Sequence, residues 1–160
     1  MKTRTVLSAI LAGLLSYSAT AYSAEMFNTG WERPSKVFDY SESNKILFHM
    51  NAKPLPDQIK AMTFSFKNMK SEVPNVSIKV IVHGDAITLF TEAKGNEAYK
   101  KFLDETRKAG VQFLICNNTL VMKQIKLAEL YGVNPIDVVP AALLEIARMQ
   151  KQGYAYIKLF

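Results

Sequence analysis

The feature that most constrains the fold is an alternation, from residue 44 onward, of short apolar runs with longer amphipathic stretches. The stretch 57–70 places Ile59, Met62 and Phe66 at helical spacing, whereas 76–82 is rich in β-branched residues, which favour strands. The predicted strands are 45–50, 76–82, 111–115, 137–139 and 154–158, and the predicted helices are 57–70, 96–109, 119–131 and 141–152. Strands that alternate with single helices predict a mainly parallel sheet with helices on both faces.

Proline and glycine set the expected ends of these elements. Pro54 and Pro56 disfavour regular structure between the first strand and the first helix. Gly110, Gly132 and Gly153 each follow a helical stretch, and glycine is common just past a helix C-terminus. The segment 86–90 fits either a short helix or a loop.

Residues 1–24 have the layout of a secretory signal peptide. A basic start precedes the apolar run 6–15, and small residues follow, so that cleavage is expected after Ala21 or after Ala24. The alternative is an uncleaved membrane anchor, but the apolar run is short for a span, which needs about 20 residues. We therefore expect export to the periplasm and no membrane attachment after cleavage.

The segment 25–43 has no helical period and predicts an extended N-terminal arm. Its large apolar residues are Met26, Phe27, Trp31, Val37, Phe38 and Tyr40. We expect this arm to pack its aromatic rings, including that of Trp31, on the domain or on a neighbouring subunit. The remaining residues, 44–160, are enough for one domain with its own core.

The charge is mildly basic and gives little support for nucleic-acid binding. The formal net charge of +6 includes Lys2 and Arg4, which a cleaved signal peptide would remove. The remaining basic residues are scattered along the chain and form no dense stripe with interleaved aromatic residues. Solvated helix faces account for this pattern better than a nucleic-acid interface does.

Three predicted strands end at chemically reactive residues, which are His49, His83 and Cys116. They are the only two histidines and the only cysteine in the chain. Because ligands of open parallel sheets bind beyond the carboxyl ends of the strands, we expect all three at one edge. Here Cys116 would be a nucleophile or sulfur carrier, and His49 or His83 would accept its proton.

Cys116 lies where the predicted strand gives way to a helix. Asn118 or Thr119 can cap that helix, and the positive end of a helix favours a thiolate over a thiol. A lone cysteine in an exported chain can also be buried and inert, or can form an intermolecular bridge. Each histidine can likewise be a hydrogen-bonded structural residue.

The same edge supplies candidate ligand contacts. Backbone N–H groups after Cys116 could hold an anion, with Asn117, Asn118 and Gly84 as candidate substrate-binding residues. The two histidines and the cysteine are also plausible ligands for copper or zinc, although no short-range ligand spacing is present. There is no glycine-rich phosphate loop and no GxSxG motif, so we expect no cofactor and no serine hydrolase.

Several short segments occur in an order that resembles a known family. They are 80–84 (VIVHG), 108–113 (KAGVQF), 116–120 (CNNTL), 138–141 (VVPA) and 152–158 (QGYAYIK). This series resembles the DsrE/DsrF-like sulfur-relay family, in particular its exported single-domain members. The resemblance implies a three-layer α/β/α fold with a five-stranded, mainly parallel sheet over 44–160, assembled as a homo-oligomer, often a trimer or hexamer.

In relay members of that family a cysteine carries sulfur as a persulfide, and Cys116 stands where the resemblance places such a cysteine. Relay members with known roles are cytoplasmic, so the predicted signal peptide and the resemblance together imply a periplasmic persulfide carrier that works with a sulfur donor or acceptor protein. No second cysteine is present to resolve a persulfide within the chain. Two alternatives stay open, a metal- or small-ligand-binding module at the same edge and a non-catalytic assembly protein, and whether the protein is an enzyme is left open too.

Overall fold

The computed structural model describes residue 40 and residues 44–160. The predicted signal peptide (1–24), the extended arm (25–43, apart from Tyr40) and the expected packing of Trp31 lie outside the described residues. Within the described part, no helix is both long and apolar enough to cross a bilayer.

A five-stranded sheet forms the centre of the domain, and every neighbouring pair of strands is parallel. The strands are β1 (Lys45–Met50), β2 (Ser77–Val82), β3 (Gln112–Cys116), β4 (Val138–Val139) and β5 (Ala155–Lys158), in the order β4-β3-β2-β1-β5. Each predicted strand is confirmed to within about two residues at either end, and the parallel sheet is confirmed. The final strand pairs with the first, which places β5 at the edge beside β1.

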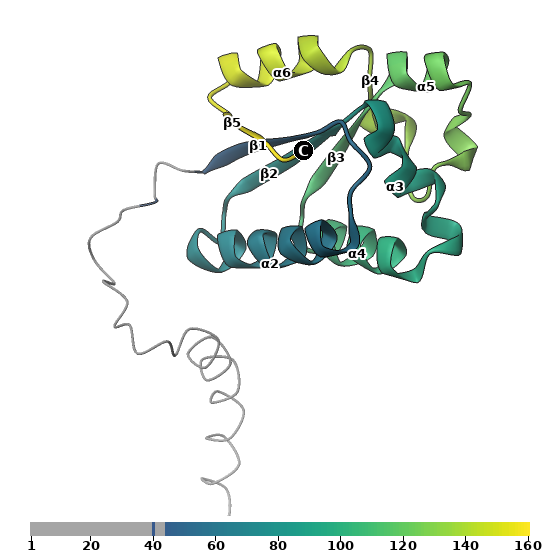
Figure 1. Cartoon of the computed structure of the whole chain (residues 1–160). Helices are drawn as coiled ribbons and strands as arrows, with labels where there is room; N and C mark the ends of the chain where they lie inside the picture. Colours follow the sequence, from purple (N-terminus) through teal and green to yellow (C-terminus); the bar gives the residue numbers. More distant parts are fainter. Residues whose placement is uncertain (1–39, 41–43) are drawn as a thin grey trace, which may run out of the picture. The chain divides into compact units, whose positions relative to one another are not determined.

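Helices cover both faces of the sheet, as predicted. Figure 1 shows α2 (Pro56–Glu72) and α4 (Glu97–Lys108) on one face and α6 (Ala142–Lys151) on the other. The shorter helical segments are η1 (Gly84–Ile87), α3 (Thr88–Thr91), η2 (Ala93–Gly95), α5 (Asn117–Lys123), η3 (Leu127–Glu129) and η4 (Pro135–Asp137). The architecture is therefore the three-layer α/β/α arrangement.

The sheet separates two apolar clusters of unequal size. The larger lies between the sheet and α2 and α4, and it includes Phe48, Phe66 and Phe113. The smaller lies beneath α6, and its members are Leu47, Ile81, Leu114, Cys116, Val139, Ala142, Ile146 and Met149. Because side chains alternate along a strand, neighbouring residues such as Leu47 and Phe48 enter opposite clusters.

The predicted helix over 119–131 is confirmed over 119–123 and is wrong beyond that point. Helix α5 ends at Lys123, and Gln124 takes a left-handed conformation with φ of 55°. The N–H of Ile125 then donates to the carbonyl of Leu120 at 2.9 Å, which closes the helix as a left-handed C-cap does. The chain continues through the short η3 turn, so that Gly132 follows a turn and not a helix.

Pro56 also departs from the prediction, because it begins α2 instead of keeping the chain out of regular structure. A proline suits the first helical position, where its missing N–H would have had no partner within the helix. The side chain of Gln58 accepts the N–H of Leu55 at 2.7 Å and so completes the start of this helix.

Candidate functional site

The three predicted strand-end residues come to one edge and to one face of the sheet. His49 is the penultimate residue of β1, His83 directly follows β2, and Cys116 is the last residue of β3. Each stands two positions after a residue of the cluster beneath α6, namely Leu47, Ile81 and Leu114. Strand alternation therefore directs all three toward the face that α6 covers.

The two imidazoles are hydrogen-bonded to each other. His49 Nε2 and His83 Nε2 lie 2.6 Å apart, and the two rings are nearly parallel, with an interplanar angle of 19°. The other ring nitrogen, His49 Nδ1, lies 2.7 Å from the hydroxyl oxygen of Tyr156 on β5. His49 is buried, whereas His83 and Tyr156 both reach solvent. The result is a continuous chain from one exposed hydroxyl through a buried ring to a half-buried ring.

Both histidines are held in the neutral form. Burial, then the charge of Lys158 and then that of His83 lower the pKa of His49 to about 4. Burial and, after it, the charge of Lys158 also lower the pKa of His83. Lys158 is fixed in place because its Nζ donates to Asn51 Oδ1 at 2.6 Å and to the carbonyl oxygen of Phe160. At neutral pH the pair is therefore uncharged beside a fixed cation.

We expect the free energy of unfolding to fall by on the order of 2 kcal/mol as the pH drops from 6.5 to about 4. The pKa of His49 is lower in the folded chain than in the unfolded chain, so the unfolded chain binds the proton first over this range. The contribution is fully present well above pH 6.5, where His49 is neutral in both the folded and the unfolded chain.

Urea unfolding between neutral pH and pH 4 measures this effect, and His49→Gln is the comparison. The pKa of Glu145 is also lowered, by its hydrogen bond to Arg148, but this carboxylate titrates in both proteins. The variant should therefore show the shallower pH dependence. Equal slopes in the two proteins would contradict the assignment to the histidine.

Cys116 is buried at the start of α6. Its side chain is 5% exposed, and Sγ accepts the backbone N–H of Ala142, the first residue of α6, at 3.3 Å. An N–H group at a helix N-terminus favours negative charge on the atom it faces. The sequence predicted a helix start beside this sulfur, and the structure supplies a second one, from α6.

The structure pairs the histidines with each other and not with the sulfur. Among the described residues, no hydrogen bond joins Cys116 Sγ to either imidazole. The register still brings His83 near, because Val82 pairs with Ile115 and the next residues along are His83 and Cys116. Neighbouring strands lie about 4.8 Å apart, so the two backbones are adjacent.

No metal-binding set is assembled at this edge. Within the part of the chain that the structure describes, no group of three or more His, Cys, Asp or Glu side chains is placed to hold a metal ion. The set predicted for copper or zinc, which is His49, His83 and Cys116, is therefore not formed in this structure.

Gly84 is a structural element of the edge and not an open anion donor. Its φ is 58°, and its N–H donates to Thr119 Oγ1 at 3.0 Å. The expectation that Asn118 or Thr119 caps α5 is wrong, because the helix begins at Asn117 without a side-chain cap. The hydroxyl of Thr119 instead joins the loop after β2 to α5.

Asn117 and Asn118, the other predicted ligand contacts, are exposed in the first turn of α5. Asn117 also lines an open depression of about 480 Å³ between α5, η3 and η4. Apolar side chains such as Leu120 and Val138 form much of its wall. Both asparagines are therefore accessible to a ligand.

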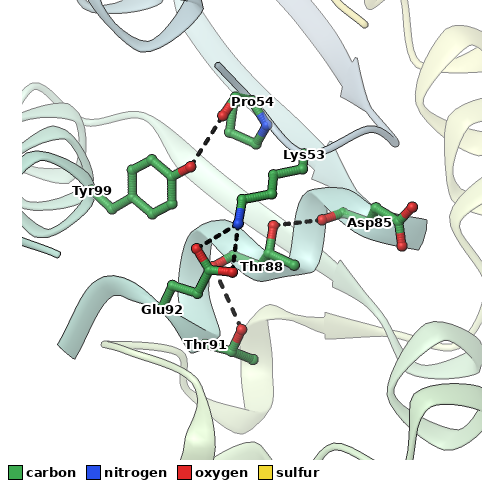
Figure 2. A network of polar contacts seen from close by, with 7 residues as sticks. All are labelled: Lys53, Pro54, Asp85, Thr88, Thr91, Glu92 and Tyr99. Atoms are coloured by element: carbon green, nitrogen blue, oxygen red, sulfur yellow. Dashed lines mark hydrogen bonds and ion pairs between the residues drawn. The ribbon is translucent and has the colours of Figure 1, made fainter. Parts of the chain in front are cut away.

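A second set of polar contacts fixes the loops around the edge, and Figure 2 shows part of it. Lys53, after β1, donates to both carboxylate oxygens of Glu92 at 2.7 and 2.8 Å. The hydroxyl of Tyr99 donates to the carbonyl of Pro54 at 3.1 Å. Such half-exposed ion pairs add little stability, but together these contacts hold the loop after β1 against α3 and α4.

Tyr156 and Lys158 are the site residues that sequence reasoning missed. They lie two residues apart on β5 and so share the face of Leu47 and His49, with which they pair. The alternation of side chains along the predicted strand 154–158 could have indicated that Tyr156 and Lys158 share one face. This would have identified them only if the strand had been known to lie beside β1. The order of the strands is not apparent in the sequence.

Comparison with known proteins agrees with this architecture. A search of curated proteins finds no match. The fold resembles that of a protein of unknown function from Methanobacterium thermoautotrophicum, with a TM-score of 0.61, 23% identity, and coverage of 71% of this chain and 97% of that one. It also resembles one from Bacteroides thetaiotaomicron, with a TM-score of 0.56, 11% identity, and coverage of 76% and 99%. The profile of the DsrE/DsrF-like family matches residues 44–159, and the chain belongs to that family.

Proposed function

We propose that this protein carries sulfane sulfur as a persulfide on Cys116. The observation that carries the proposal is the N–H of Ala142 directed at Sγ from the start of α6, at the carboxyl end of β3. Membership of the DsrE/DsrF-like family supports it, since a sulfur-relay type of function is plausible for such a fold. The absence of a second cysteine favours a carrier over a self-resolving enzyme.

The chemistry is a transfer of one sulfur atom. The thiolate of Cys116 attacks the terminal sulfane sulfur of a polysulfide or of thiosulfate, and a new S–S bond forms at Sγ. The bond from that sulfur to the rest of the donor breaks, and the leaving group takes the electron pair as a shorter polysulfide or as sulfite. The cysteine proton passes to a base or to water.

Transfer requires the sulfur to be uncovered. Cys116 packs in the cluster beneath α6, beside Val139 and Ala142. The link between those two residues is the short segment Pro140–Ala141, which joins β4 to α6. We propose that the first turn of α6 moves aside to admit the donor, which would break the hydrogen bond from Ala142 and expose Sγ.

We further propose that the protein works in the periplasm as a homo-oligomer, a trimer or hexamer, together with a sulfur donor or acceptor protein. The basic and apolar start of the sequence supports export. Large exposed apolar side chains on α5 and α6 support assembly or partner contact, and they are Val121, Met122, Leu143 and Leu144. Fractionation of cells and light scattering of the mature protein test location and assembly.

The test of persulfide formation is intact mass after incubation with polysulfide or thiosulfate. We expect the wild-type mass to rise by about 32 Da for each sulfur atom added, and the gain to vanish in Cys116→Ser. Prior alkylation of Cys116 in the wild type should block the gain equally. A wild-type mass that stays unchanged, or a gain that persists in the variant, would reject the proposal.

A second candidate is a small-ligand-binding module at the same edge. The neutral pair of His49 and His83 favours it, because one ring is half-buried and open to a ligand. Reaction of the native thiol with iodoacetamide separates the candidates. A carrier must expose Cys116 transiently and be labelled in the folded state, whereas a binding module or an assembly protein would be labelled only on unfolding.

A further inference from the structure

The contact between the two imidazoles determines where protons can lie. Two ring nitrogens 2.6 Å apart, His49 Nε2 and His83 Nε2, form a hydrogen bond only if one of them carries a hydrogen and the other does not. The same choice fixes the far side of the His49 ring. When His49 Nε2 is bare, its Nδ1 carries the hydrogen and donates to Tyr156; when Nε2 carries the hydrogen, Tyr156 donates to Nδ1.

The hydrogen-bonded series of Tyr156, His49 and His83 therefore has two neutral arrangements. They differ in which atom of each hydrogen bond carries the hydrogen. The two ends of this series are the hydroxyl of Tyr156, with a side chain 39% exposed, and Nδ1 of His83. Among the described residues, His83 Nδ1 has no hydrogen-bond partner. A proton can enter at one end and leave at the other while the buried ring of His49 stays neutral.

The surrounding charges favour transfer of a proton along these hydrogen bonds over a proton that stays on one of the two imidazoles. Lys158 on β5 is the cation that faces both rings, and its Nζ is held by Asn51 and by the carbonyl of Phe160. Among the described residues, no carboxylate hydrogen-bonds either imidazole. A lasting imidazolium would therefore be buried beside a like charge, which lowers the pKa of both histidines.

We propose that Tyr156, His49 and His83 form a proton relay that removes the proton from a thiol or hydropersulfide at this sheet edge and releases a proton to solvent at Tyr156. His83 is the group that meets the sulfur substrate, and His49 and Tyr156 are positioning residues. The substrate class rests on the proposed function, whereas the relay itself rests on the hydrogen-bonded chain. His83 and Cys116 follow paired residues of β2 and β3, so the backbones of the open end of the relay and of the cysteine are adjacent at this edge.

The proton balance is complete without a further reactant. His83 Nδ1 accepts the thiol proton, and its Nε2 proton passes to His49 Nε2. The Nδ1 proton of His49 passes to the Tyr156 oxygen, whose own proton leaves to water. One proton has entered and one has left, the thiolate keeps the sulfur electron pair, and both rings have exchanged tautomers. The chain is reset when His83 Nδ1 gives its proton to the departing sulfite or shorter polysulfide anion and Tyr156 takes up a proton from water.

Nitrogen-15 NMR of the histidine side chains tests the relay separately from sulfur transfer. At neutral pH we expect two neutral rings and one strongly deshielded proton correlated with both Nε2 atoms, in the wild type and in Cys116→Ser. Tyr156→Phe should shift the Nδ1 resonance of His49 and change the balance between its two tautomers. Tyr154→Phe is the matched control, since that hydroxyl contacts Ser77 Oγ at 3.0 Å and not the histidines. Absence of the shared proton, or a charged ring at neutral pH, would overturn the relay.

Kinetics then tests the role of His83. We expect His83→Ala to slow persulfide formation on Cys116 by about 100-fold, and added imidazole to restore much of the rate. Tyr156→Phe should slow it at least about tenfold, with Tyr154→Phe unchanged. Normal rates in His83→Ala would overturn the relay and leave the persulfide proposal intact. A wild type that takes up no sulfur but shows the shared proton would reject the carrier function and retain the hydrogen-bonded relay.

Discussion

Replacing Gly84 with alanine should lower the free energy of unfolding by about 3 kcal/mol. The backbone of Gly84 has a φ of 58°, and a Cβ there would lie 2.8 Å from the carbonyl oxygen of Asn51. That oxygen accepts the N–H of Asp85 at 2.9 Å, so it cannot retreat without weakening the bond between the loops after β1 and β2. Left-handed strain and a backbone clash therefore add together at the position that follows His83.

Urea unfolding measures this loss as a lower midpoint with an unchanged slope. Gly153→Ala is the matched control, because Gly153 has a φ of 85° but no heavy atom within 4 Å of the position that a Cβ would take. We expect Gly153→Ala to cost only the conformational strain, about 1 kcal/mol. Equal losses in the two variants would show that the carbonyl of Asn51 yields freely.

Replacing Phe90 with alanine should lower the free energy of unfolding by about 3–5 kcal/mol, the usual cost of emptying a buried aromatic site. Phe90 on α3 is fully buried, and its ring meets Phe113 edge-on, with centroids 5.4 Å apart at 79°. The guanidinium of Arg107 lies 5.7 Å from both ring centroids. Loss of the ring leaves a cavity and removes part of the packing that places the segment after β2.

The control for this variant is Phe64→Ala on α2, where the side chain is 44% exposed. We expect a smaller loss there, about 1–2 kcal/mol, because nearly half of the side chain is already exposed to water. Thermal unfolding of both proteins at one concentration gives the comparison. A small effect for Phe90→Ala would mean that the core beneath α3 closes over the missing ring.

The strands could be predicted because their signal is local. Residues 76–82 and 111–115 combine apolar and β-branched side chains in short runs, and both are strands in the structure. The end of α5 could not be predicted in this way. Gln124 adopts a left-handed conformation that usually marks glycine, and the sequence 119–131 keeps a helical pattern beyond that point.

The sequence predicted which residues meet at one edge of the sheet, but it did not predict their partners, because those depend on the order of the strands. Alternation of strands and helices placed His49, His83 and Cys116 at one edge, and the structure brings them there. The partner of His49 comes from β5, and the N–H that reaches Cys116 comes from α6. Both contacts depend on the order of the strands in the sheet and on the path of the chain over it. Neither contact produces a recognisable spacing of residues in the sequence.

The pairing of β1 with β5 also determines when the hydrogen bonds among Tyr156, His49 and His83 can form. His49 and Tyr156 are 107 positions apart, so a ribosome has made β1 to β4 and α6 before the hydroxyl is available. A nascent or clipped product that stops short of Tyr156 contains the residues of β1 to β4 but lacks the hydroxyl that contacts His49. Assembly of these hydrogen bonds is thereby coupled to synthesis of the polypeptide as far as β5.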